Sequence, residues 1–376
     1  MPSEHAIQEC LSAVTLPGLS QPLASIANIR MPAEGVCEVV LGFPARSHQQ
    51  QYEAFLRDSL AAQGLSCEVS VSWEIAAHQA SQGIKNMENV RNIIAVASGK
   101  GGVGKSTTSV NLALALAAEG ARVGLLDADI YGPSVQMMLG VESGVRPKQY
   151  GTQYLLPIEA QGIQSMSMAY LVTEKTPMVW RGPMATGALQ QLLYQTYWQD
   201  LDYLIIDMPP GTGDIQLTLS QKVPVAGAVV VTTPQDIALL DAKKGIEMFA
   251  KVSVPVLGVV ENMAVHVCSQ CGHAEHIFGE GGGEHIARDY AVPMLGALPL
   301  SMQIREQADR GAPVVTQAPD SEAAQLYRDM ATATAVELAR RQRSSAAACR
   351  RGGAAARRHG GAAVRRFLHQ VGAPVC

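Results

Sequence analysis

The sequence predicts an α/β fold built on a doubly wound, mainly parallel sheet, with a smaller α/β domain ahead of it. Two observations support this prediction. From residue 93 onward, apolar runs that suit strands buried on both faces alternate with segments of helical composition. The first of these runs, residues 93–97, passes through a glycine-rich loop into a helix expected over residues 105–119. Such alternation is typical of a parallel sheet covered by helices.

The chain has room for more than one domain, because it contains 376 residues of which 47% are apolar. Residues 1–78 predict a small α/β domain, with helices at 6–14 and 48–63 and strands at 25–31, 36–43 and 67–73. Residues 79–92 are polar and suit a linker. The larger domain is expected over residues 93–341. The tail, residues 342–376, is rich in alanine, glycine and arginine, which predicts disorder.

The charge distribution argues against general nucleic-acid binding. The formal charge is −4, but the segment after residue 340 holds eight arginines and no acidic residue, so −12 remains once these eight are set aside. The chain begins without a basic and apolar leader, and no apolar run reaches the ~18 residues of a membrane span. We therefore expect a cytoplasmic protein without stable membrane association, whose seven cysteines are mostly reduced thiols.

The glycine-rich loop carries a complete P-loop pattern, G-x-x-x-x-G-K-S, from Gly99 to Ser106. Backbone N–H groups of such a loop surround the phosphates of a nucleotide, Lys105 can reach the outer phosphates, and the Ser106 hydroxyl can ligate Mg²⁺. The strand and helix on either side favour this interpretation over a merely tight turn. The expected nucleotide-binding residues are Gly99, Lys100, Gly101, Gly102, Val103, Gly104, Lys105, Ser106 and Thr107.

Two further strands lead into aspartates at the edge of the sheet where open α/β folds bind ligands. The run at residues 122–127 ends in Asp127 and continues to Asp129, and the run at residues 202–207 ends in Asp207. Carboxylates at this edge can hold Mg²⁺, which we expect of Asp127 and Asp207, or orient an attacking water. Helix capping or turn formation is the alternative role for Asp127 and Asp129.

The rest of the larger domain continues the alternation of strands and helices. Strands are expected at residues 227–232, 256–262 and 294–298, and helices at residues 237–251 and 321–341.

A single C-x-x-C pair, Cys268 and Cys271, predicts a metal or cluster site, because a turn of this spacing points both sulfurs the same way. Two thiolates are too few, since structural zinc and four-iron clusters take four ligands. Gly272 suits poorly the helix that a redox C-x-x-C normally opens. Zinc completed within the chain is the other alternative, although the nearby histidines have unusual spacing for a zinc finger. They are His266, His273, His276 and His285.

The segment K-G-G-V-G-K-S, from Lys100 to Ser106, resembles the signature of the deviant P-loop ATPases. In that group the first lysine crosses a dimer interface to the partner's nucleotide, so the resemblance implies that Lys100 acts in an ATP-bound homodimer. It also implies that Asp129 orients the attacking water and that Asn262 and Pro299 contact adenine. A twofold axis would bring together the two C-x-x-C pairs of such a dimer, which favours a cluster shared between subunits.

Five segments together resemble the Mrp/ApbC family of iron–sulfur cluster carrier ATPases over about residues 84–341. These are S-G-K-G-G-V-G-K-S-T, L-D-A-D-I-Y-G-P-S, W-R-G-P-M at residues 180–184, D-M-P-P-G-T-G-D and C-x-x-C. The resemblance implies a homodimer that holds a labile [4Fe-4S] cluster between its subunits and passes it to apo-proteins, with slow ATP hydrolysis linked to transfer. Cluster assembly scaffolds are the other implied partners. The small domain resembles, more loosely, the one fused ahead of iron–sulfur assembly ATPases.

Two other functions are open at this stage. A partition or positioning ATPase of the same fold acts as a nucleotide switch, but it has no use for a C-x-x-C pair and needs a basic membrane helix. A reductase resembling the nitrogenase iron protein also takes two cysteines from each subunit, but from widely separated segments. The close spacing of Cys268 and Cys271 therefore favours the carrier.

Overall fold

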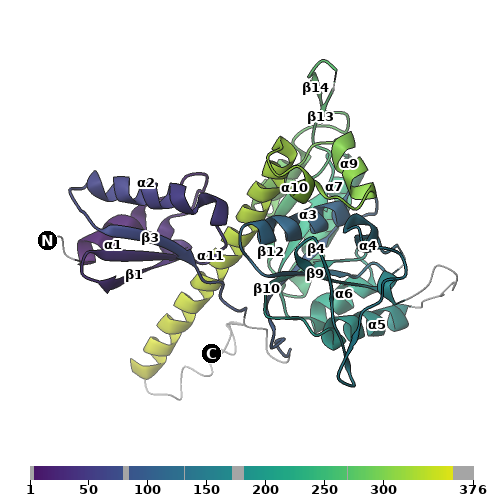
Figure 1. Ribbon diagram of the computed structural model, residues 1–376, viewed down its shortest axis with the longest axis horizontal. Helices are drawn as coiled ribbons and strands as arrows, with labels where there is room; N and C mark the ends of the chain where they lie inside the picture. Colours follow the sequence, from purple (N-terminus) through teal and green to yellow (C-terminus); the bar gives the residue numbers. More distant parts are fainter. Residues whose placement is uncertain (1–3, 79–83, 131, 172–181, 269, 359–376) are drawn as a thin grey trace. The chain divides into compact units, whose positions relative to one another are not determined.

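The computed structural model describes residues 4–78, 84–130, 132–171, 182–268 and 270–358, and Figure 1 shows its course. The chain divides into two compact units. The small unit combines the residues up to Ala76 with those from Ala335 onward, and the large unit takes in Ile84–Thr334. No helix in the described part of the chain is both long and apolar enough to cross a membrane.

The small unit has a three-stranded sheet in the order β1-β2-β3, in which β2 runs antiparallel to β1 and parallel to β3. One helix precedes the sheet and a second connects its last two strands in the sequence. Their apolar residues Leu11, Tyr52 and Leu56 are fully buried. The elements lie within two or three residues of the expected ones. They are α1 (Glu4–Ala13), η1 (Leu23–Ser25), β1 (Ala27–Ala33), β2 (Val36–Leu41), η2 (Arg46–His48), α2 (Gln49–Ala61) and β3 (Glu68–Trp73).

The last helix, α11 (Glu322–Arg358), differs from the expected one, because it continues past residue 341. Alanine and arginine, which suggested a disordered tail, are also strong helix formers. From Ala335 the helix belongs to the small unit, where a Cβ at Gly42 would lie 3.0 Å from Cβ of Ala339. Arg343 donates a hydrogen bond to Oδ1 of Asn28 (2.7 Å). Residues 359–376 of the predicted tail, and residues 79–83 of the predicted linker, lie outside the described residues.

The large unit is a doubly wound α/β domain, as predicted. Its sheet has the strand order β15-β12-β11-β4-β10-β5-β9-β8, and every neighbouring pair is parallel except β8 with β9. The strands are β4 (Val90–Ala97), β5 (Val123–Asp127), β8 (Ile158–Ala160), β9 (Ile163–Ser167), β10 (Leu201–Asp207), β11 (Val225–Thr232), β12 (Val256–Glu261) and β15 (Met294–Ala297). Two short hairpins stand apart from it, β6 (Gln149–Tyr150) with β7 (Tyr154–Leu155) and β13 (His266–Val267) with β14 (Ala274–Glu275).

Helices alternate with these strands along the chain. They are α3 (Lys105–Ala118), α4 (Val135–Met138), η3 (Met168–Tyr170), α5 (Gly182–Gln195), α6 (Asp214–Lys222), α7 (Asp236–Lys251), α8 (Gly282–Asp289), α9 (Met302–Asp309) and α10 (Val314–Gln317). The strands expected in this domain, and the helices expected at residues 105–119 and 237–251, are confirmed to within a few residues. The sequence did not predict the remaining elements, which are the strands β6 to β9, β13 and β14 and the helices α4, η3, α5, α6, α8, α9 and α10. Of the W-R-G-P-M segment, residues 180 and 181 lie outside the described part of the chain.

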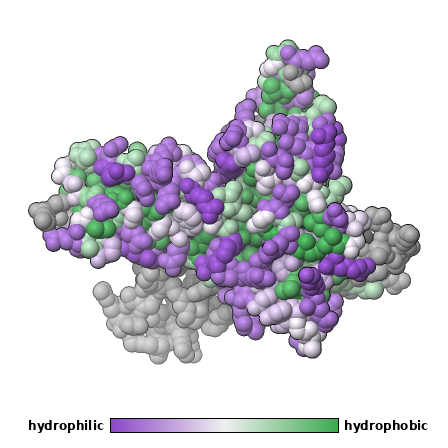
Figure 2. All heavy atoms as spheres, in the orientation of Figure 1, coloured by the Kyte–Doolittle hydropathy of each residue, from purple (hydrophilic) through white to green (hydrophobic). Residues whose placement is uncertain are grey.

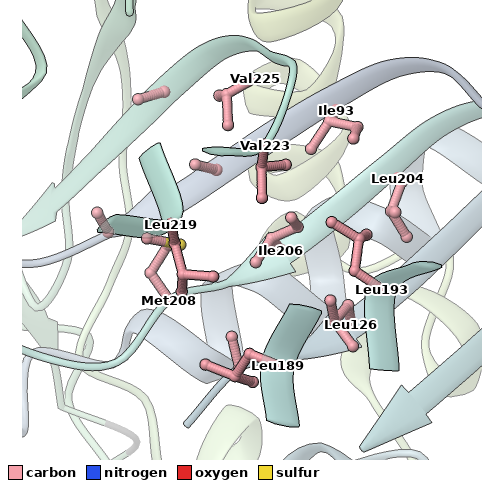
Figure 3. Close-up of a cluster of buried hydrophobic side chains, with 14 of the residues drawn as sticks. Ile93, Leu126, Leu189, Leu193, Leu204, Ile206, Met208, Leu219, Val223 and Val225 are labelled. Atoms are coloured by element: carbon pink, nitrogen blue, oxygen red, sulfur yellow. The ribbon is translucent and has the colours of Figure 1, made fainter. Parts of the chain in front are cut away.

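The core forms because consecutive side chains of a buried strand point to opposite faces of the sheet. Ile93 of β4 and Leu204 and Ile206 of β10 gather with Leu189 and Leu193 of α5, as Figure 3 shows. The intervening residues, Ile94 and Val96, are also buried, on the face against which α3 packs. A rigid sheet therefore carries the loop that follows β4 and the carboxyl end of β10 beside it.

Candidate functional site

The loop from residue 98 to 104 joins the buried strand β4 to helix α3, and the structure requires glycine at two places in it. Gly104 has φ of +82°, and a Cβ there would lie 2.1 Å from Nδ2 of Asn262. A Cβ at Gly99 would lie 2.2 Å from the backbone carbon of Asp241 in α7. Gly104 thus needs both the left-handed conformation and the space that only glycine allows. Helix α3 follows at Lys105, so its N-terminal N–H groups face the loop.

Lys105, Ser106 and Asp207 meet at the carboxyl edge of the sheet, where α3 begins beside the end of β10. Nζ of Lys105 lies 2.7 Å from Oδ1 of Asp207, and the Ser106 hydroxyl donates to Oδ2 of Asp207 at 2.6 Å. The lysine is only 6% exposed and the aspartate 0% exposed. A third hydroxyl, that of Ser109, donates to Oδ1 of Asp207 at 2.7 Å. Three side chains of α3 therefore surround one buried carboxylate of β10.

Asp127 ends β5, the strand next to β10, and organises the loop that follows it. Its Oδ1 accepts a hydrogen bond from the N–H of Asp129 (3.1 Å), and its Oδ2 accepts from the N–H groups of Ser134 and Val135 (3.1 Å each) and from the Ser167 hydroxyl (3.2 Å). Two causes raise the pKa of Asp127 to about 7: the larger is burial, and the second is the negative charge of Asp207. The capping and turn role considered for Asp127 is thus what its contacts show.

Asp129 lies in the same loop and is partly exposed. Its Oδ1 accepts a hydrogen bond from the N–H of Gly132 at 3.2 Å. This contact fits the turn role as well as the expected catalytic one, which stays a prediction.

Lys100 contacts its own chain. Its Nζ donates a hydrogen bond to Oε1 of Gln235 at 3.1 Å, and its carbonyl accepts one from the Ser98 hydroxyl at 2.9 Å. Gln235 immediately precedes α7, the helix that packs against Gly99. The predicted reach of Lys100 into a partner therefore requires this hydrogen bond to break.

Asn262 and Pro299 follow β12 and β15, two neighbouring strands of the sheet. Asn262 is 8% exposed, and its Nδ2 donates to the carbonyl oxygen of Val103 at 2.8 Å. This contact supports the P-loop backbone. Pro299 is half-buried at the start of the segment that leads to α9. Adenine contact by either residue stays a prediction.

Cys268 and Cys271 lie at the end of the β13–β14 hairpin, which projects from the large unit (Figure 1). We refer to residues 266–275 as the cysteine hairpin. The N–H of Cys268 donates to the carbonyl of His273 and the N–H of Gly272 donates to the carbonyl of Cys268, both at 2.9 Å. Cys271 is exposed and Cys268 partly so. Hydrogen bonds from the N–H groups of Gln270 and Cys271 lower the pKa of Cys268.

The geometry of the cysteine hairpin tests two alternatives for Cys268 and Cys271, a redox pair and a zinc site completed within the chain. The cysteines lie in a turn, so the helix opening of a redox C-x-x-C is absent from this described segment. Among the described residues, no three His, Cys, Asp or Glu side chains group closely enough to hold a metal ion. Nδ1 of His266 pairs with the carbonyl of Leu300 and Nδ1 of His276 with the carbonyl of Ala264. Within the described residues, the hairpin of a single chain therefore offers two sulfur ligands and no completed zinc site.

Ser109 and Gln235 are among the residues of this site that were not predicted from the sequence. Ser109 is four residues after Lys105 and thus on the same helical face, a spacing that could have revealed it. Gln235 follows β11, the strand next to β4, in the sequence T-T-P-Q.

A P-loop with its lysine, its serine hydroxyl and a carboxylate from the adjacent parallel strand defines a nucleotide-binding P-loop NTPase. Residues 89–335 match the family model of ParA proteins described as the NUBPL iron-transfer P-loop NTPase. The chain belongs to this family of iron-transfer NTPases.

Curated relatives and a solved structure extend the comparison. An iron-sulfur cluster carrier protein of Pseudomonas fragi is 65% identical over 266 residues, which cover 71% of this chain and 93% of the relative. A protein of the same name from Haemophilus influenzae is 49% identical over 342 residues, 89% of this chain and 92% of the relative. A nucleotide-binding protein from Archaeoglobus fulgidus, solved in complex with ADP, is 36% identical, with a TM-score of 0.55 over 64% of this chain and 93% of that one.

Proposed function

We propose that this protein is an ATP-hydrolysing carrier of iron–sulfur clusters, in which a homodimer holds a labile [4Fe-4S] cluster between its subunits and passes it to apo-proteins. The observation that carries the proposal is the projecting, accessible pair of thiols, Cys268 and Cys271, on a P-loop NTPase of the iron-transfer family. The relatives from Pseudomonas fragi and Haemophilus influenzae, which bear the carrier name, support it.

The cysteine hairpin suits a cluster that is loaded and given away. Backbone N–H groups that donate to the Cys268 sulfur favour its thiolate, the form that binds iron. Two thiolates from each of two subunits complete the four ligands that a four-iron cluster takes. Val267, next to Cys268 in the sequence, and Ile277, two residues after the hairpin, are 52% and 50% exposed. Figure 2 shows hydrophobic residues among hydrophilic ones at this tip. Such side chains suit burial against another protein surface.

The residues at the P-loop fit ATP with Mg²⁺. The Ser106 hydroxyl and the Asp207 carboxylate, 2.6 Å apart, are the hard oxygen donors that Mg²⁺ takes. Asp127 would help to hold the ion indirectly, because its own oxygens already accept hydrogen bonds from the loop. Bound Mg²⁺ supplies positive charge that offsets the charge on the phosphates during transfer.

The chain's own groups bind and orient the nucleotide. The loop N–H groups bind the phosphates, and Lys105 leaves Asp207 to contact the outer ones. Asp129 orients the attacking water. Lys100 leaves Gln235 and contacts the nucleotide of the second subunit, which makes hydrolysis depend on the dimer. Asn262 and Pro299 contact the adenine base.

Partners and location follow from the same proposal. The acidic body of the chain suits protein partners, namely apo iron–sulfur proteins and assembly scaffolds, rather than nucleic acid. We place this activity in the cytoplasm, where thiols stay reduced.

Anaerobic reconstitution with iron and sulfide tests the proposal, with iron and sulfur counted per dimer. The expected result is about four of each per dimer, as one [4Fe-4S] cluster requires. Cys268→Ser and Cys271→Ser should each lose the brown chromophore, whereas Cys10→Ser, a partly buried thiol of the small unit, should keep it. Full cluster absorbance in both hairpin variants, or tightly bound zinc in place of iron, would contradict the proposal.

ATP hydrolysis is tested separately by phosphate release from the same preparations. Lys105→Ala should abolish turnover yet retain the reconstituted cluster, because the lysine and the cysteine hairpin belong to different segments of the large unit. Unchanged turnover in Lys105→Ala would remove the nucleotide part of the proposal and leave the cluster part standing.

A further inference from the structure

Ser109 contacts Asp207 without belonging to the P-loop pattern. Its side chain is 0% exposed, and its Oγ lies 2.7 Å from Oδ1 of Asp207 and 3.0 Å from the carbonyl oxygen of Lys105. Both neighbours accept hydrogen bonds, so the single hydroxyl hydrogen is shared between them. The hydrogen bond to the Asp207 carboxylate is the stronger of the two, because hydrogen bonds to ionised groups are shorter and stronger than those to neutral groups.

The two oxygens of Asp207 face different partners. Oδ1 meets the Lys105 ammonium and the Ser109 hydroxyl, while Oδ2 meets the Ser106 hydroxyl. In the proposed function, Lys105 moves to the nucleotide phosphates. Of the donors described here, Ser109 then remains on Oδ1, on a carboxylate that is fully buried. A buried charge that loses its hydrogen-bond donors is costly, so the carboxylate would otherwise turn toward new partners.

We propose that Ser109 is a positioning residue for magnesium: it holds Oδ1 of Asp207 so that Oδ2 stays beside the Ser106 hydroxyl when Lys105 leaves. This inference rests on the ATP part of the proposed function. The helical spacing places Ser109 for this role. It lies one turn after Lys105, so both side chains reach the same strand, β10, from one face of α3. A short hydroxyl is sufficient at residue 109, because Asp207 lies 2.7 Å away.

The test compares Ser109→Ala with Ser220→Ala. Ser220 is a matched control, because it is also a buried helical serine with a hydrogen bond to the carbonyl four residues earlier, at 2.8 Å from Gln216. Binding of a fluorescent ATP analogue to the nucleotide-free protein is measured over a range of magnesium concentrations and in EDTA. Thermal unfolding of both variants checks that they are folded.

The expected result is a change in magnesium dependence alone. Ser109→Ala should need about tenfold more magnesium for half-maximal enhancement of nucleotide affinity, as loss of one hydrogen bond to a charged group predicts. Its affinity in EDTA should stay within about twofold of wild type, and Ser220→Ala should match wild type throughout.

Two outcomes would overturn the inference and spare the proposed function. One is a Ser109→Ala variant with the magnesium dependence of wild type. The other is a loss of affinity that is equal with and without magnesium, which indicates a general structural role. A wild-type protein whose nucleotide affinity is indifferent to magnesium would overturn both the inference and the ATP part of the proposed function.

Discussion

The Lys105 ammonium and the Asp207 carboxylate form a buried ion pair, 2.7 Å from Nζ to Oδ1, in which neither side chain is more than 6% exposed. The lysine of the P-loop is thus neutralised by a side chain of its own site. In the proposed function, nucleotide phosphates replace Asp207 as the partner of this lysine, which leaves the carboxylate available to a cation. Phosphate binding and metal binding are then linked by this one exchange of partners.

Removing Lys105 should destabilise the nucleotide-free protein through Asp207. Lys105→Ala is expected to lower the free energy of unfolding by about 3 kcal/mol, because breaking a buried ion pair leaves an uncompensated charge. The double variant Lys105→Ala with Asp207→Ala should lose clearly less than the sum of the two single variants. Urea unfolding followed by tryptophan fluorescence measures all three.

An exposed ion pair provides the control for this comparison of single and double variants. Nζ of Lys244 lies 2.9 Å from Oδ1 of Asp241, but the lysine side chain is 56% exposed. Lys244→Ala should therefore cost less than about 1 kcal/mol. Additive losses in the Lys105 and Asp207 variants would contradict the coupling inferred from their distance.

Mixing two inactive variants should restore hydrolysis if Lys100 acts across a dimer. A Lys100→Ala subunit keeps its own P-loop, and a Lys105→Ala partner supplies the missing Lys100. Random pairing makes half of the dimers mixed, each with one competent site, so about a quarter of wild-type activity is expected. Phosphate release is measured for each variant and for an equimolar mixture. A mixture no more active than its components would show that the site is not shared.

Changing Gln235 should alter how readily Lys100 leaves its own subunit. Gln235→Glu places a negative charge 3.1 Å from Nζ and should weaken dimerisation with a non-hydrolysable ATP analogue. Gln235→Ala removes the hydrogen bond and should strengthen it. Sedimentation velocity measures the dimer fraction of both variants in parallel. If both variants raised the dimer fraction, or both lowered it, the result would contradict a role for this contact.

Among the five cysteines that the structure describes, Cys268 should be the most reactive thiol of the cluster-free protein. Its pKa is lowered by hydrogen bonds from the N–H groups of Gln270 and Cys271, whereas burial raises the pKa of Cys37 to about 12. The thiolate is the nucleophile, so a lowered pKa keeps alkylation fast as the pH falls below the ordinary thiol range.

Iodoacetamide labelling between about pH 6 and 9, read by peptide mass spectrometry, measures this order. Cys268 should label first, Cys271 later, and Cys37 only after unfolding, because it is 0% exposed. Equal rates for the two hairpin thiols would refute the effect of the backbone hydrogen bonds.

The sequence predicted those features that depend on local pattern. Strand β4, helix α3 and the aspartate that ends β10 follow from apolar runs and a glycine-rich loop, and the parallel order then places Lys105 beside Asp207. The pairing of Lys100 with Gln235 could not be predicted, because it joins residues 135 positions apart. The hydrogen bonds that make Asp127 a loop organiser also depend on tertiary structure. Nor did composition distinguish a disordered tail from the continued helix α11.

The small unit is completed by the end of the chain. Gly42, directly after β2, packs against Ala339, and Asn28 accepts a hydrogen bond from Arg343, some 300 residues later in the sequence. During synthesis, the strands of this small sheet must therefore wait for some 300 further residues before their partner helix emerges. A fragment cut at the linker would lack that helix, so excising the N-terminal domain alone removes part of what holds it folded.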